Sequence, residues 1–376
     1  MKRHCLTPRP TWEATVREHG LSWPRDASGA VYWDESAAYE ISEGEVARLE
    51  ETAAELQDLY IQATEEVIRK GRWDELGVAP ALVPLVRESW EREEFTLYGR
   101  FDMVLDWRGQ PQLLEYNADT PTALLEASVV QWQWLQETRP GADQWNGLHE
   151  QLVAAWRRLG PGKIHFASVA DGWEDEVTLA YLEETARQAG RETAHLPMAA
   201  LGWHAGHRCF TDEEEQPIRT LFKLYPWEWM MREDFACHLE ASGCRFLEAP
   251  WKLLWSNKAM LAVLWELFPS HPALLPCYRD QGLLGDSYVR KPCFSREGAN
   301  VRIVERGRVT AEQDGPYGGE GWVYQAVAEN EAQEGQWPVL GVWMVDGAPA
   351  GLGIREDSQR ITGNASRFVP HWIAGG

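Results

Sequence analysis

The chain has 376 residues, 44% of them hydrophobic, and its 36 basic and 58 acidic residues give a formal net charge of −22. An apolar content this high, with 21 tryptophans, excludes a mainly disordered chain. No run of 18 apolar residues is present, which excludes a membrane-spanning helix, and the negative charge makes nucleic acid a poor candidate partner.

The cysteines and the first residues bear on the cellular compartment. Six cysteines are scattered without paired spacing, and the N-terminus leads into a proline-rich polar stretch. Both features predict reduced thiols in a cytoplasmic protein and no secretory signal. The motif His204-x-x-His207-x-Cys209 lacks a fourth ligand at zinc spacing, so we interpret it as a loop.

The first third of the chain predicts helices followed by a hairpin. Residues 1–40 carry no periodic pattern and are expected to be irregular. Ser42 and Glu45 form a capping box that should begin a helix reaching about Lys70. Further predicted elements are a helix over 81–90, strands over 101–106 and 112–117 joined by a turn, and a helix over 123–136.

After residue 141 strands and helices alternate, and from 287 onward short strands follow one another. The alternation predicts a βαβ layer, and the later strands predict an antiparallel region, so the expected fold class is α/β (α+β). The predicted strands are 164–169, 192–196, 243–248, 288–291, 301–304, 308–311, 322–327, 339–345 and 351–355, and the predicted helices are 174–188 and 257–268.

Polar side chains share one face of each strand of the predicted hairpin. Arg100 and Asp102 lie two residues apart on one strand, and Glu115 and Asn117 on the other. Asp, Glu and Asn supply the hard oxygen ligands that magnesium prefers. Spacing alone leaves a second interpretation open, namely exposed strands with incidental charges.

Two later segments also combine a strand with charged residues. In 289–301 a strand carries Lys291 into a turn that bears Arg296 and Gly298, where backbone N–H groups could hold phosphate oxygens. The segment is not a Walker A loop, and a plain hairpin is the alternative. In 351–357 a strand ends in charges, which a salt-bridged strand terminus would also explain.

Together these motifs resemble the glutathionylspermidine synthase family, in particular its C-terminal synthetase domain, an ATP-grasp ligase. The resemblance covers nearly the whole chain, and its most specific stretches are 100–102, 115–122, 221–228, 256–258, 290–300 and 355–357. It implies one catalytic unit over 1–376. Its approximate subregions are 1–140 with the helices and metal-binding hairpin, 141–255 with the βαβ substrate-side layer, and 256–376 with a strand-rich nucleotide lobe.

The resemblance also implies a role for each matching residue. Asp102, Glu115 and Asn117 would bind two Mg²⁺ ions at the ATP phosphates, while Arg100 and Arg296 would act at the transferred phosphoryl group, with Arg296 on a mobile turn. The expected ATP-binding residues are Lys258, Lys291, Gln325, Arg360 and Thr362. The expected substrate-binding residues are Thr120 and Thr122 toward a thiol peptide, Glu174 and Asp175 near the amine and peptide sites, and Arg355 near both substrate and nucleotide.

The implied function is an ATP-dependent carboxylate–amine ligase working through an acyl phosphate, with glutathione or another peptide or amino acid as a possible acid and a polyamine as a possible amine. Leu224 and Asn364 replace a threonine and a basic residue of the family, which leaves both substrates open. The length leaves no room for the amidase domain of bifunctional members. The alternatives are a non-catalytic ATP or polyamine sensor, a carboxylate kinase, and a ligase for another acid–amine pair; the oligomeric state is not predicted.

Overall fold

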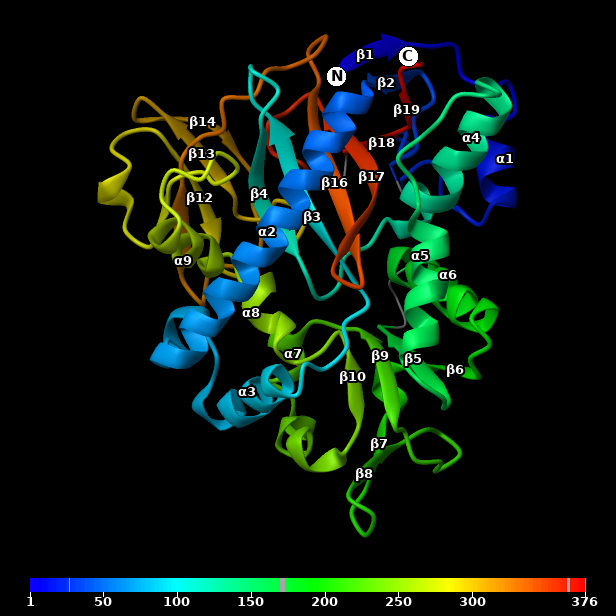
Figure 1. Ribbon diagram of the computed structural model, residues 1–376, viewed down its shortest axis with the longest axis vertical. Coiled ribbons are helices and arrows are strands. Elements are labelled where there is room, and N and C mark those ends of the chain that lie inside the picture. Colours follow the sequence, from blue (N-terminus) through cyan, green and yellow to red (C-terminus); the bar gives the residue numbers. More distant parts are fainter. Residues whose placement is uncertain (27, 170–172, 364–365, 376) are drawn as a thin grey trace.

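A computed structural model describes residues 1–26, 28–169, 173–363 and 366–375 of the chain. Within these ranges the strands form five sheets, and helices pack against the larger ones, whereas the hairpin of β7 (Gly202–His204) and β8 (Cys209–Thr211) projects from the lower end (Figure 1). The α-helices are α1 (Trp12–Glu18), α2 (Glu43–Lys70), α3 (Val83–Glu91), α4 (Gln131–Thr138), α5 (Leu148–Arg158), α6 (Trp173–Gln188), α7 (Trp227–Met230), α8 (Lys252–Ser256) and α9 (Ala259–Leu267).

A five-stranded antiparallel sheet joins the predicted hairpin to the end of the chain. Its strands, in spatial order, are β18 (Arg367–Val369), β17 (Ala348–Asp357), β16 (Trp337–Val345), β3 (Tyr98–Leu105) and β4 (Pro111–Asn117). Side chains alternate between the two faces of such a sheet. Phe101 and Tyr116 stack with ring centroids 3.9 Å apart and both pack against Tyr60 of α2, so the polar residues that flank them along each strand face the other side.

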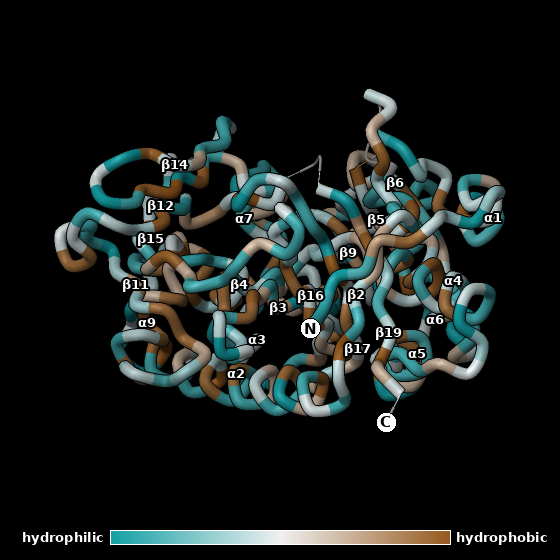
Figure 2. The backbone as a smooth tube through the Cα atoms, turned by 90° about the horizontal axis from the view of Figure 1, so that it is seen from above, coloured by the Kyte–Doolittle hydropathy of each residue, from teal (hydrophilic) through white to brown (hydrophobic). Residues whose placement is uncertain are grey.

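Helix α2 crosses this sheet diagonally, and Figure 2 shows hydrophilic and hydrophobic residues alternating along its turns. Its N-terminus is the predicted capping box: the Glu45 N–H donates to Ser42 Oγ, and the Ser42 N–H donates to the Glu45 carboxylate at 2.9 Å. Gly71 ends the helix with a φ of 67°, a conformation that glycine adopts without steric cost. Both ends of this helix therefore follow from local sequence.

The predicted βαβ layer is a parallel sheet. Its strands, in spatial order, are β10 (Arg245–Leu247), β9 (Thr220–Leu224), β5 (Ile164–Ser168) and β6 (Thr193–Pro197). Every residue of β5 is buried, as expected for a parallel strand covered on both faces. Helix α6 packs against β5 and against α5. The sequence analysis did not predict β9, which is one of the two inner strands of this sheet.

The predicted antiparallel region is confirmed by a second five-stranded sheet. Its strands, in spatial order, are β11 (Cys277–Tyr278), β15 (Trp322–Gln325), β12 (Tyr288–Pro292), β13 (Arg302–Glu305) and β14 (Arg308–Glu312). All the pairings within it are antiparallel. The sheet lies beside β4 and α9 (Figure 1).

One prediction of local structure was wrong, and two others need refinement. Residues 1–40 contain β1 (Lys2–Cys5), α1 and β2 (Ala37–Ile41), and β2 pairs with β19 (His371–Ile373). This pairing is between the two ends of the chain, which no local pattern reveals. In the segment expected to be a loop, β7 (Gly202–His204) and β8 (Cys209–Thr211) form a hairpin, and His207 lies in the turn that joins them. The expected helix over 123–136 contains a π-helical turn, Glu126–Val130, before α4.

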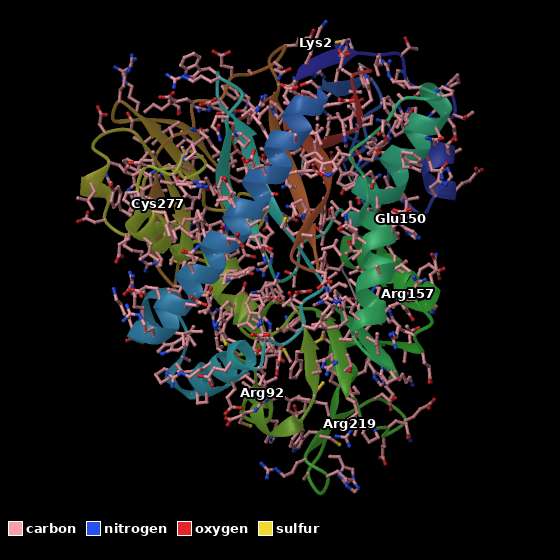
Figure 3. The ribbon with its side chains drawn as sticks, in the orientation of Figure 1. Lys2, Arg92, Glu150, Arg157, Arg219 and Cys277 are labelled. Atoms are coloured by element: carbon pink, nitrogen blue, oxygen red, sulfur yellow. The ribbon has the colours of Figure 1, made fainter. Side chains whose placement is uncertain are left out.

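The exposure of the side chains follows their polarity. The side chains of Lys2, Arg92, Glu150, Arg157 and Arg219, labelled in Figure 3, are exposed, whereas that of Cys277 is buried. The six cysteines are free thiols. Among the residues that the structure describes, no helix has the length and apolar character needed to cross a lipid bilayer.

Candidate active site

A cavity of about 660 Å³ brings together residues from both five-stranded sheets and from the βαβ layer. All but one of the residues predicted for the site line it, and the exception, Lys258, contacts the lining residue Glu115 at 3.1 Å. The predicted lining residues are Arg100, Asp102, Glu115, Asn117, Thr120, Thr122, Glu174, Asp175, Lys291, Arg296, Gln325, Arg355, Arg360 and Thr362.

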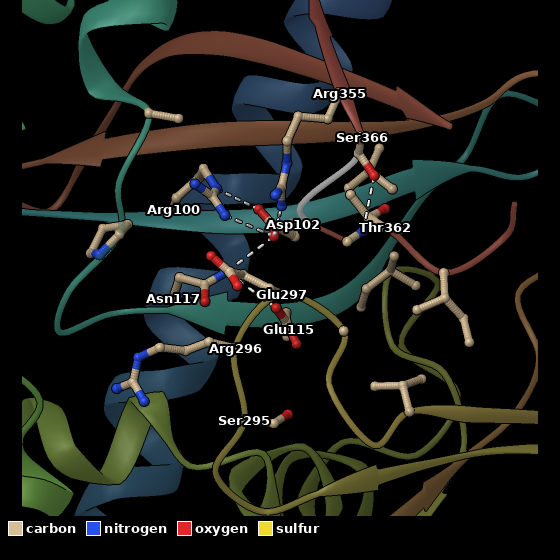
Figure 4. Close-up of a pocket in the computed structure, with 18 of the residues that line it drawn as sticks. Arg100, Asp102, Glu115, Asn117, Ser295, Arg296, Glu297, Arg355, Thr362 and Ser366 are labelled. Carbon is tan, nitrogen blue, oxygen red and sulfur yellow. Dashed lines mark hydrogen bonds and ion pairs between the residues drawn. The ribbon is translucent and has the colours of Figure 1, made fainter. Parts of the chain in front are cut away.

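The hairpin of β3 and β4 places the oxygen-bearing side chains next to one another. In its register Asp102 pairs with Glu115 and Arg100 pairs with Asn117. Asn117 Nδ2 donates to Asp102 Oδ2 at 3.0 Å, and Arg100 Nε donates to Asp102 Oδ1 at 2.6 Å. Arg355 of β17 reaches the same carboxylate at 3.3 Å (Figure 4). The predicted convergence of these four hairpin residues is confirmed in the geometry.

Two buried lysines set the charge beside this cluster. Burial disfavours the ionised Glu115, but Lys258 and Lys291 outweigh that effect and lower the pKa of its carboxyl to about 2. Burial also lowers the pKa of Lys291 to about 8, although Glu115 favours its charged form. Lys291 Nζ donates to Gln325 Oε1 at 2.6 Å and to the Leu114 carbonyl at 2.9 Å. The cluster therefore keeps an ionised carboxylate at neutral pH.

The donor chemistry fits magnesium. Two carboxylates and an amide oxygen are hard ligands, and a magnesium ion completes its coordination with water or phosphate oxygens. The part of the chain that the structure describes contains no group of three or more His, Cys, Asp or Glu side chains arranged to hold a metal ion by themselves. Asp102, Glu115 and Asn117 would consequently hold the ion together with the phosphates of a nucleotide, not as a closed protein site.

Arg296 lines the cavity, but its guanidinium points away from Asp102 and Glu115 (Figure 4). Its Nη2 donates to Glu228 Oε1 at 2.7 Å, and the guanidinium lies 5.0 Å from the ring centroid of Trp229. The structure thus places Arg296 in the predicted turn after β12, beside Glu228 and Trp229 and apart from Arg100.

The turn that carries Arg296 packs closely on the chain segment after β17. Gly298 has a φ of 68°, and a Cβ at this position would lie 2.5 Å from the Thr362 carbonyl oxygen and 2.7 Å from an Ile361 methyl carbon. Only glycine permits this conformation and this approach together. The contact explains how Thr362 and the turn come to line one cavity.

Sequence reasoning missed an acidic group beside the predicted Glu174 and Asp175. Tyr32 lines the cavity and donates or accepts hydrogen bonds with Glu126 at 2.7 Å and Glu174 at 2.9 Å. Burial and the nearby Glu174 raise the pKa of Glu126 to about 7, and burial followed by Glu174 raises that of Asp175 to about 6. No sequence signal marked Tyr32, because its segment has no periodicity, or Glu126, because its helix was expected to be regular.

The cavity also has an apolar part. Thr120 and Thr122 line the cavity together with Leu224 and with the half-exposed side chains of Val169 and Trp229. Leu224, where the resemblance predicts a threonine, is therefore part of the cavity wall. Asn364, the other departure, lies outside the described residues.

Comparisons with known proteins agree with this geometry. The glutathionylspermidine synthase preATP-grasp family model matches residues 3–374. The "Putative acid--amine ligase" of Haemophilus influenzae is 38% identical over 92% of both chains. The trypanothione synthetase of Crithidia fasciculata is 29% identical over 84% of this chain, and the bifunctional glutathionylspermidine synthetase/amidase of Escherichia coli is 27% identical over 88%. These matches cover 53% and 58% of those two relatives, so the chain spans little more than half their length.

A solved structure supports the fold. The apo form of a glutathione synthetase-like effector from Globodera pallida superposes with a TM-score of 0.59, covering 99% of this chain and 100% of that one at 9% sequence identity. At this identity the likeness establishes the α/β synthetase fold alone. The family match over almost the whole length, with the 38% identical relative, establishes the family. The chain belongs to the glutathionylspermidine synthase preATP-grasp family.

Proposed function

We propose that the chain is an ATP-dependent ligase that joins a carboxylic acid to an amine through an acyl phosphate. One observation supports this most strongly: Asp102, Glu115 and Asn117 meet in the same cavity as Lys291 and Arg100. Oxygen ligands for Mg²⁺ beside buried cations are what a site needs to hold a nucleoside triphosphate and stabilise charge on a phosphoryl group in transfer.

The reaction has two parts. The acid's carboxylate attacks the γ-phosphoryl group of ATP and gives an acyl phosphate with release of ADP; the amine then displaces phosphate and forms the amide. Magnesium, when bound, supplies positive charge at the phosphate oxygens. Arg100, held by Asp102 and by the Thr122 carbonyl at 2.9 Å, would orient the transferred group. Lys258 and Lys291 would hold the phosphates, with Gln325, Arg360 and Thr362 toward the rest of the nucleotide.

We assign the two substrates to different walls of the cavity. Thr120, Thr122 and Arg355 would meet the acid, and Glu174 with Asp175 would attract the ammonium groups of the amine. The relatives are named for glutathionylspermidine and trypanothione synthesis, so glutathione with spermidine is the first pair to test. We also propose one catalytic unit over residues 1–376, acting on small molecules in the cytoplasm.

The test is ADP and phosphate release by the purified chain with Mg-ATP. Glutathione, cysteine-containing dipeptides and free amino acids are each combined with spermidine or another amine, and the amide product is identified by mass spectrometry. We expect release to require both an acid and an amine. Release with the acid alone would indicate a carboxylate kinase, and Mg-ATP binding without turnover for any pair would favour the sensor. No Mg-ATP binding and no product would refute the proposal.

A further inference from the structure

Tyr32 connects two carboxyl groups that come from separate parts of the chain. Its hydroxyl lies 2.7 Å from Glu126 Oε1 and 2.9 Å from Glu174 Oε1. Glu126 belongs to the π-helical turn, Glu174 to the first turn of α6, and Tyr32 to the segment between α1 and β2. Tyr32 and Glu174 line the cavity, whereas Glu126 is 2% exposed and lies behind its wall.

The Tyr32 hydroxyl has one hydrogen atom for two carboxyl partners. A tyrosine hydroxyl has one hydrogen to donate, and an ionised carboxylate can only accept. If both carboxyl groups were ionised, the Tyr32 oxygen would face one of them lone pair to lone pair at hydrogen-bond distance. Two hydrogen bonds form only when one carboxyl carries a proton, donates it to Tyr32, and Tyr32 in turn donates to the other. The geometry therefore calls for one shared proton on this pair of acids.

The surroundings agree with a shared proton. Burial raises the pKa of Glu126, and the nearby Glu174 raises it further; burial also raises the pKa of Glu174. The opposing cations are Arg100, which acts on both carboxyls, and Arg355, which acts on Glu174; Glu297 adds negative charge. Arg100 is itself engaged by Asp102, which limits how much it can neutralise the acids.

We propose that Tyr32 and Glu126 are positioning residues of the amine site, holding one proton with Glu174 so that this carboxyl group stays fixed toward the cavity and the pair carries a single negative charge. This inference rests on the proposed ligase function for its substrate, a cationic amine. A single charge on the pair, beside Asp175, suits one ammonium group, whereas two adjacent buried carboxylates would repel each other. Neither Tyr32 nor Glu126 needs to touch the reacting atoms.

The first test needs no substrate. Infrared spectra of the free protein are recorded between pH 5 and 9 for the wild type and for E126Q, Y32F and Y181F. We expect the wild type to show a protonated carboxyl band at pH 6 that E126Q lacks and that Y32F shifts. Tyr181 is the matched control, because it is 7% exposed like Tyr32 and bonds to His149 outside the cavity. If E126Q removes no protonated carboxyl band at pH 6, there is no shared proton and the proposal is refuted.

The second test uses whichever acid–amine pair the substrate screen returns. Y32F should raise the KM for the amine about 10-fold or more, as expected for losing a hydrogen bond to a charged group, and leave the KM for ATP within twofold. E126Q should keep the amine KM near the wild-type value at pH 7, since the amide N–H can donate to Tyr32 as the acid does. An unchanged amine KM in Y32F would overturn the positioning role. If no pair is turned over, the infrared result still decides the shared proton independently of the ligase proposal.

Discussion

Arg296 Nη2 donates to Glu228 Oε1 at 2.7 Å. This hydrogen bond keeps the side chain of Arg296, which we propose to act in phosphoryl transfer, beside Glu228. Glu228 is 5% exposed, and the Arg296 side chain also lies over Trp229. To reach a phosphate beside Asp102 and Glu115, the guanidinium has to leave Glu228. The proposed mechanism thus requires the Arg296 side chain to break its contact with Glu228 when Mg-ATP binds.

Arg296→Ala is expected to lower kcat by about 10²- to 10⁵-fold, because it removes a cation that would stabilise the phosphoryl group in transfer. The Kd for Mg-ATP, measured by calorimetry, should change only a few-fold, since the buried lysines remain. Arg232→Ala is the control: Arg232 is exposed and pairs with Glu320. Wild-type turnover in Arg296→Ala would show that this turn has been assigned the wrong role.

Glu115→Gln should raise the Mg²⁺ concentration needed for half-maximal ADP release by about tenfold or more, since a charged oxygen ligand becomes neutral. The same change leaves Lys258 without its ion pair at 3.1 Å, so ATP affinity has to be measured separately. Glu334→Gln, which alters an exposed carboxylate paired with Arg3, is the control. A magnesium requirement equal to that of the wild type would remove Glu115 from the proposed metal site.

Gly298→Ala should lower kcat/KM for ATP by about 10- to 100-fold, because the added Cβ displaces the turn from the segment at 361–362. Gly285→Ala is a close control: the two glycines have φ of 68° and 70°, but a Cβ at Gly285 meets nothing within 4 Å. Both variants share the backbone strain, so the difference between them isolates the contact. Equal kinetics for the two would mean that the close approach does not matter for catalysis.

The parts of the site that sequence reasoning predicted are those built on short-range patterns. The alternation around Arg100 and Asp102, and around Glu115 and Asn117, placed each pair on one strand face, and the hairpin register then joined them. The helix from Ser42 to Lys70 carried its own start and stop signals. The resemblance to a family supplied the roles, which spacing alone left open.

What the sequence did not reveal depends on contacts between distant segments. Tyr32 reaches Glu126 across 94 positions and Glu174 across 142 positions. The strand β2 forms because β19, at the far end of the chain, pairs with it. Burial of Glu126 is likewise a tertiary property, since the pattern over 123–136 only indicated a helix with an apolar face. The orientation of Arg296 toward Glu228 also depends on a contact between distant segments.

Because the pKa of Glu126 is raised in the folded protein, we expect the free energy of unfolding to depend on pH. With the pKa of Glu126 raised to about 7, the folded protein keeps this proton up to about that pH, whereas the unfolded chain releases it near 4.5, the ordinary pKa of a glutamate carboxyl. The stabilising contribution is therefore fully present below pH 4.5 and is lost as pH rises through 7. A shift of this size corresponds to about 3 kcal/mol at most.

Glu126→Gln removes the titration, so the free energy of unfolding of the variant minus that of the wild type should increase from pH 5 to pH 8, by up to about 3 kcal/mol, which means that the variant becomes relatively more stable. Urea unfolding at the two pH values measures the difference. Glu150→Gln, on the exposed side of α5, should show no such trend. A Glu126→Gln effect equal at both pH values would mean that Glu126 is ionised in the folded protein, and Tyr32 would then be able to donate to only one of its two carboxyl partners.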